Sequence, residues 1–256
     1  MYREGLDRIN IFILFISFSR EGFMSKPKKI TVKFFLNKTV KPIKEGNTST
    51  YPLYILLTYN RKSTMLRSHY GGYYKDLKQI NKVHYPGLLE LEERIVKKTV
   101  AYEAEQKKDL FDLKGIHEKY DKYAVGIDTL LDNYMKAHLW NMVIRLEPQE
   151  YAFALNFNEP KVSYRTLYAM ASKLFVNFEK LQSKEFKEEI EVYNTYLKLY
   201  QGAFFQYAFP TVIEWIDKSA VEDYKAKLTK IYKKDEIKIK RSLEIINKVV
   251  YSSSGL

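Results

Sequence analysis

The spacing of apolar residues changes once along the chain, near Pro86, and this change constrains the fold more than any other feature of the sequence. Before it, apolar residues occupy every second position in short segments that end at polar turns, which is the pattern of half-buried strands. After it, they recur at helical spacing, and glycine and proline are rare. The sequence therefore predicts an α+β protein, in which a small three-stranded antiparallel sheet within residues 24–85 precedes a larger all-α helical domain, residues 86–256.

The three expected strands lie close together in the sequence. The first begins at Ile30, and the second covers residues 51–59. Residues 60–62, Asn-Arg-Lys, are predicted to form a short turn into the third strand, at about residues 63–70. We expect residues 38–50 to be a polar loop, and the glycine pair after the third strand to end the sheet.

Helices are predicted throughout the second part of the chain, with a linker near residues 148–162, between Pro148 and Pro160. Ser163 is placed to cap the helix that follows the linker. The predicted helical segments cover residues 87–113, 126–146, 163–181, 184–209, 210–234 and 235–250.

Residues 1–23 are interpreted as a non-native N-terminal extension. Their apolar run, residues 11–18, has eight residues, whereas a helix needs about 20 to span a bilayer. Acidic residues before the run, and the lack of a small-residue cleavage site after it, disfavour a secretory signal. We expect translation to begin at Met24; the alternative is that residues 11–18 add a buried strand or helix.

The net charge of +12 is concentrated in one part of the chain. Residues 24–85 hold 13 basic and two acidic residues, whereas residues 86–256 hold 27 basic and 26 acidic residues. Such a concentration of cations is typical of proteins that bind phosphates. It predicts an anionic partner for the sheet rather than for the helices.

The residues 30–38, ITVKFFLNK, followed by a loop and by residues 51–64, YPLYILLTYNRKST, resemble the arm-type DNA-binding domain at the N-terminus of Bacteroidetes-type tyrosine recombinases, which are phage integrases. The likeness covers about residues 28–70 and weakens through residue 110. It implies an integrase-like protein of a phage or mobile element, connected with DNA integration. In such a protein the sheet lies in the major groove of duplex DNA and the loops contact phosphates.

Side chains on the outward face of the sheet and in its loops are the expected DNA contacts. Lysines on loops and flanks suit phosphates, which position a protein on DNA without reading its sequence. Asn60, Arg61 and Arg67 suit base edges, because amide and guanidinium groups form paired hydrogen bonds with bases. The predicted DNA-binding set is Lys28, Lys29, Lys33, Lys38, Lys41, Lys44, Tyr54, Thr58, Asn60, Arg61, Lys62 and Arg67.

The chain departs from the family in two ways. Leu56 stands at an outward position that is often basic, and the residues after the third strand differ from the usual ones. Recombination also needs a His-x-x-Arg box and a tyrosine nucleophile, and none of the four histidines is followed by arginine three residues later. We therefore expect a protein that is not an enzyme.

The remaining candidate sites are interpreted as structural. The acidic segments at residues 89–94 and 187–191 are predicted to be exposed, ion-paired helix faces rather than catalytic carboxylates. Residues 117–121, HEKYD, lack the second histidine of a zinc-protease motif, so no metal site is expected there. The absence of cysteine excludes disulfides and thiolate metal sites and favours a cytoplasmic location. We expect no cofactor and no membrane partner.

Two functions of different classes agree with these features. The first is a non-catalytic double-stranded DNA-binding protein of a mobile element or phage, whose helical domain binds a protein partner or a second copy of itself. The second is a structural or assembly protein of such an element, which docks through its basic sheet on an acidic protein or on packaged nucleic acid. An unfamiliar enzymatic activity of the helical domain ranks below both.

Overall fold

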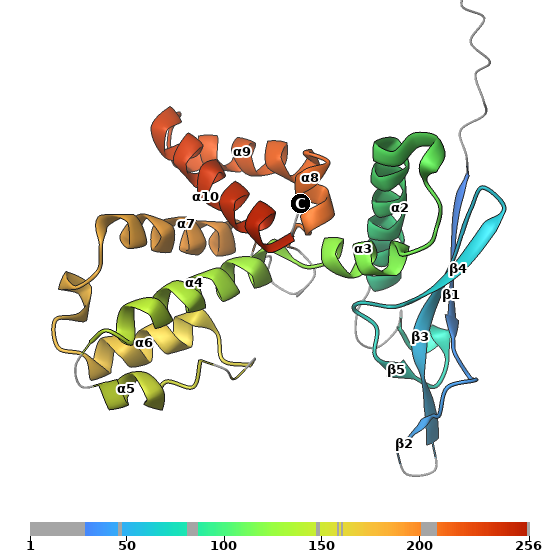
Figure 1. Ribbon diagram of the computed structural model, residues 1–256, viewed down its shortest axis with the longest axis horizontal. Coiled ribbons are helices and arrows are strands. Elements are labelled where there is room, and N and C mark those ends of the chain that lie inside the picture. Colours follow the sequence, from blue (N-terminus) through green and yellow to red (C-terminus); the bar gives the residue numbers. More distant parts are fainter. Residues whose placement is uncertain are drawn as a thin grey trace, which may run out of the picture.

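The computed structural model confirms the α+β order, with an antiparallel sheet first and helices after it (Figure 1). The predicted extension, residues 1–23, and the predicted contact Lys28 lie outside the described residues. The described ranges are residues 29–45, 48–80, 87–146, 149–157, 159, 161–200 and 209–254.

One long strand, β3 (Thr48–Tyr59), pairs with every other described strand of the sheet. Strands β1 (Ile30–Leu36) and β4 (Lys62–Arg67) run antiparallel to its second half, one along each edge. Strands β2 (Ile43–Glu45) and β5 (Tyr73–Tyr74) pair with its first half. The sheet is therefore held together by a single central strand.

The described residues form five strands rather than the predicted three, because two segments expected to be irregular pair with β3. Residues 43–45 pair with residues 48–50, and the Thr50 hydroxyl donates a hydrogen bond to the Ile43 carbonyl at 3.1 Å. Residues 73–74 pair with residues 51–52. Both added strands are too short to show a two-residue alternation, so periodicity does not reveal them.

Helix α2 (Leu88–Lys107) covers one face of the sheet (Figure 1). The inward side chains Ile55, Leu57 and Leu66 are at most 1% exposed and belong to the same hydrophobic core as Ile95 and Val100 of α2. The core therefore continues across residue 86, where the sequence suggests a domain boundary. The inner face of the sheet depends on α2 for its burial.

The other helices extend this core away from the sheet (Figure 1), and its members include Val249 and Val250 of α10. Within the described ranges, no helix is both long and apolar enough to cross a bilayer. The other described helices are α1 (Leu77–Gln79), α3 (Ile116–Tyr123), α4 (Ile127–Val143), α5 (Gln149–Ala154), α6 (Tyr164–Leu174), α7 (Lys184–Tyr200), α8 (Val212–Ile216), α9 (Ser219–Ile231) and α10 (Glu236–Ser254), with single 3₁₀ turns at η2 (Lys108–Leu110) and η3 (Phe178–Lys180).

The segment predicted to be a linker contains the short helix α5, and its residues Ala152 and Leu155 are buried. The predicted cap is present after it, because the Ser163 hydroxyl accepts a hydrogen bond from the Thr166 amide at 3.3 Å. Helix α6 ends at Leu174, earlier than its predicted end at residue 181.

A buried carboxylate fastens the end of β4 to helix α2. The Glu92 side chain accepts hydrogen bonds from the His69 amide at 2.7 Å, the Tyr70 amide at 3.1 Å and the Tyr120 hydroxyl at 2.7 Å. The Ser68 hydroxyl lies 2.7 and 2.8 Å from its two oxygens. Burial, followed by the charge of Glu92, raises the pKa of Tyr120 well above its ordinary value, so this phenol keeps its proton and donates a hydrogen bond to the carboxylate.

The prediction that residues 89–94 and 187–191 are exposed faces is wrong for one carboxylate in each segment. Glu92 is fully buried, and Glu189 is 2% exposed. Glu189 accepts a hydrogen bond from the Tyr134 hydroxyl at 2.6 Å, and it lies 2.7 Å from His138 Nδ1. Both carboxylates join helices or strands that are distant in sequence, so the charge pattern of one helix does not identify them.

A close approach of the chain to itself follows β4. A Cβ atom at Gly71 would lie 2.3 Å from Ser68 Oγ and 2.8 Å from Leu53 Cδ2, whereas the nearest atom to a Cβ at Gly72 is Tyr74 Oη, at 3.8 Å. Glycine is therefore required at the first position of the pair and not at the second.

The Gly71→Ala variant is expected to lower the free energy of unfolding by about 1–3 kcal/mol, because the added methyl group overlaps its neighbours. The Gly72→Ala variant makes the same chemical change in open space and is expected to stay within about 0.5 kcal/mol of the parent. Urea unfolding followed by circular dichroism measures both. Equal effects of the two substitutions would contradict the steric argument.

The Glu92→Gln variant is expected to lower the free energy of unfolding by about 2–4 kcal/mol, since it removes a buried acceptor and turns an amide NH₂ toward other donors. The control is Glu93→Gln, because the Glu93 side chain is 40% exposed and forms an ion pair with Lys97 at 2.5 Å. Its effect is expected to be at most about 0.5 kcal/mol. Thermal or urea unfolding of the two variants tests this difference, and a mild effect of Glu92→Gln would show that the network is not required.

Candidate nucleic-acid interface

The face of the sheet that points away from α2 presents a regular grid of side chains. The strand register places three side chains in each row, one from β1, one from β3 and one from β4. All of them are exposed or half-buried. The rows are Phe35–Tyr54–Arg67, Lys33–Leu56–Met65 and Thr31–Thr58–Ser63. We call this surface the outer face.

The structure brings four predicted contact residues together on the outer face: Lys33, Tyr54, Thr58 and Arg67. They lie there because side chains alternate along each strand, so that the neighbours of buried residues point outward. The guanidinium and the ammonium group occupy opposite edges of the grid, on β4 and β1. Polar groups and cations therefore surround Leu56, the central residue of the grid.

The turn between β3 and β4 has the predicted two-residue form, since Tyr59 pairs with Lys62. Asn60 and Arg61 both have positive φ angles, 49° and 64°. This conformation destabilises residues with a Cβ atom by about 1 kcal/mol, and glycine usually occupies the second position. The turn therefore keeps an arginine at the exposed tip at the expense of conformational stability. Lys29 lies at the same end, because Ile30 pairs with Tyr59.

The remaining predicted lysines lie at the other end of β3. Lys38 and Lys41 are in the connection after β1, and Lys44 is on β2, which pairs with the start of β3. At about 3.3 Å per residue, the 12 residues of β3 separate the two ends by roughly 36 Å. The predicted residues thus form three groups along β3. The tip holds Lys29, Asn60, Arg61 and Lys62, the outer face holds Lys33, Tyr54, Thr58 and Arg67, and the far end holds Lys38, Lys41 and Lys44.

The cations of these three groups lack internal counter-charges. Lys29, Lys33, Lys38, Lys41, Lys44, Arg61, Lys62 and Arg67 are all exposed, and none forms an ion pair with a side chain that the structure describes. The helical part differs, because many of its cations are neutralised, as in the pairs Arg94–Glu214 at 3.0 Å and Lys98–Asp217 at 2.5 Å. Positive potential is therefore concentrated on the sheet.

Sequence reasoning placed Leu56 on the outward face but missed that Met65 lies beside it. Met65 is 59% exposed, and Leu56 beside it is half-buried. The rings of Phe35 and Tyr54 lie 6.1 Å apart with a 42° tilt. The alternation along β4 could have predicted this position of Met65. Ser63, Met65 and Arg67 occupy every second position, and Met65 is adjacent to the buried Leu66.

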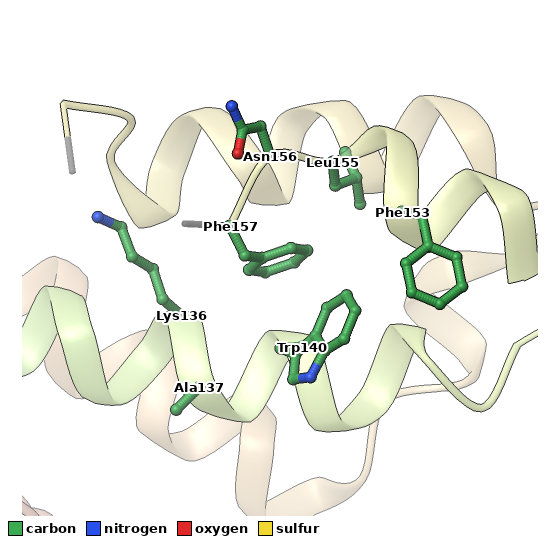
Figure 2. A pocket seen from close by; sticks show the side chains of 7 residues that line it. All are labelled: Lys136, Ala137, Trp140, Phe153, Leu155, Asn156 and Phe157. Carbon is green, nitrogen blue, oxygen red and sulfur yellow. The ribbon is translucent and has the colours of Figure 1, made fainter. Parts of the chain in front are cut away.

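A separate cavity of about 300 Å³ lies in the helical part, between α4 and the segment after α5 (Figure 2). The Trp140 ring faces Phe157 and Phe153, with ring centroids 5.2 and 5.9 Å away. Lys136 reaches its rim, but the ammonium group is paired with Asp132 at 3.0 Å. The cavity therefore does not extend the unpaired cationic surface. In the described ranges, no cluster of three or more acidic or histidine side chains is placed to hold a metal ion.

Comparisons of the chain with protein-family models, with curated proteins and with solved structures give no match. The resemblance to arm-type domains stays a prediction.

The Arg61→Gly variant is expected to raise the free energy of unfolding by about 1 kcal/mol, because glycine adopts the positive φ angle without strain. The control is Arg67→Gly, which removes the same charge from the last residue of β4, where φ is not positive, and is expected to lower the free energy of unfolding by about 0.5–1 kcal/mol. Urea unfolding measures both values. Effects of the same sign would contradict the assignment of strain to the tip.

Proposed function

We propose that the chain is a non-catalytic double-stranded DNA-binding protein of a mobile element or phage, and that it binds DNA through the tip, the outer face and the far end of the sheet. The observation that carries the proposal is the segregation of charge. Eight exposed cations without described counter-charges lie on the sheet, in a segment with two acidic residues, whereas the 27 basic residues of the helical part are nearly balanced by 26 acidic residues. Phosphates are the ligands that such a surface favours, because they supply the missing negative charge.

The dimensions of the sheet support a duplex rather than a compact anion. The two cationic ends of β3 are roughly 36 Å apart, and one turn of B-DNA rises about 34 Å. Neighbouring strands are about 4.8 Å apart, so the β3–β4 hairpin fits a major groove about 12 Å wide. In this arrangement the lysines at the two ends contact phosphates, while the outer face and the tip residues Asn60 and Arg61 meet base edges.

The helical part has a supporting role in this proposal. It buries the inner face of the sheet through α2, and it leaves large apolar side chains exposed elsewhere, such as Leu110, Val176 and Ile237. These side chains suit a protein partner or a second copy of the chain. The competing function is an assembly protein whose sheet docks on an acidic protein.

The test is the salt dependence of binding between the full chain and a labelled duplex, measured by fluorescence anisotropy. If about six phosphates are neutralised, the logarithm of affinity falls against the logarithm of salt concentration with a slope near −5. The Lys44→Gln variant is expected to reduce the magnitude of this slope by about 1. The matched control, Lys97→Gln, removes a cation that already pairs with Glu93 and is expected to leave the slope unchanged.

Failure to bind duplex DNA, or equal effects of Lys44→Gln and Lys97→Gln, would overturn the proposal. Retention of binding to an acidic protein under the same conditions would then favour the assembly function.

A further inference from the structure

We propose that Leu56 and Met65 read thymine methyl groups in the major groove, so that the DNA site contains adjacent base pairs with thymine at the centre of the contact. The inference rests on the proposed function. It assigns a specificity-determining role to two apolar residues that hydrogen-bond reasoning about base recognition leaves out.

The position of Leu56 is the first observation. It lies in the middle row of the outer face, on the central strand, with Lys33 opposite on one side and Met65 opposite on the other. It has no hydrogen-bonding group in its side chain, so a base edge that faces it gains only from apolar contact. A polar edge in that place would lose its water without a replacement partner.

The chemistry of the groove supplies the second step. Thymine is the one standard base that presents a methyl group in the major groove. Met65 is 59% exposed beside Leu56, and directly opposed side chains in a sheet have Cβ atoms about 4.5–5.5 Å apart. Successive bases on one strand are about 3.4 Å apart. The two side chains therefore match methyl groups on neighbouring base pairs.

The side chains around Leu56 and Met65 disfavour other binding modes of the outer face. The Thr58 and Ser63 hydroxyls lie 2.8 Å apart and hydrogen-bond to each other, so one of their donors is already used. The Phe35 and Tyr54 rings are half-buried and pack together, which leaves them less free to stack on the bases of a single strand. Unpaired Lys33 and Arg67 flank the apolar pair, as suits a strongly anionic partner rather than an apolar protein surface.

The experiment starts with selection of bound sequences from a random duplex library, using the full chain. Each thymine of the selected site is then replaced by deoxyuridine, which removes only the methyl group. Loss of a contacted methyl is expected to weaken binding about three- to fourfold, the fold-change that corresponds to about 0.8 kcal/mol. In the Leu56→Ala variant, the deoxyuridine effect at one position is expected to disappear.

Two further variants keep the test specific. Leu110→Ala makes the same substitution at a helical residue that is 89% exposed, and it is expected to leave every deoxyuridine effect unchanged. Leu56→Lys introduces a donor and is expected to shift the selected base at that position from thymine to guanine, since lysine donates to guanine O6 and N7. Circular dichroism checks that each variant is folded.

The outcomes separate the two proposals. A selected site whose thymines all tolerate deoxyuridine, or retention of every deoxyuridine effect in Leu56→Ala, overturns the methyl contact and leaves duplex binding intact. Salt-dependent binding without any selected motif also overturns it, because no base is then read. Absence of duplex binding overturns the proposed function and this inference together.

Discussion

The buried carboxylate of Glu92 fixes how the sheet sits on the helices, and the rest of the architecture follows from that contact. It gathers donors from the end of β4 and from α3, while its own backbone belongs to α2. The Tyr70 hydroxyl adds a hydrogen bond to the Ala124 carbonyl just after α3. A buried charge with these partners has one favourable arrangement, because each lost donor would leave it under-solvated. The inner face is thereby held against α2, and the other face is left to solvent.

This geometry explains the distribution of charge. The inner side of the sheet is occupied by apolar residues, so the cations of β1, β4 and the connecting turns can lie only on the outside. In the helical part, cations and carboxylates share helix faces and meet at short distances, as in the pair Lys227–Asp223 at 2.7 Å. The sheet segment offers few such partners, because residues 24–85 contain only two acidic residues.

The parts of the fold that the sequence predicts are those set by local periodicity. The alternation of Leu53, Ile55 and Leu57 identifies the central strand, and the Asn60–Arg61 turn follows from the polar break after it. Contacts between distant residues are not encoded in this way. In the sequence, Glu92 cannot be told apart from its half-buried neighbour Glu93; only the fold brings Ser68 and Tyr120 to Glu92. Likewise, the outward lysines were predictable from alternation, whereas the row that joins Leu56 to Met65 requires the strand register.

The exposed cations also affect the energetics of folding. Like charges on one small sheet repel one another, and this repulsion is present in the compact state more than in the extended chain. Any polyanion that associates only with the compact state relieves the repulsion and shifts the folding equilibrium by mass action. The melting temperature of this protein therefore depends on its ionic surroundings as well as on the chain. Its value in buffers rich in phosphate or sulfate differs from its value in dilute chloride.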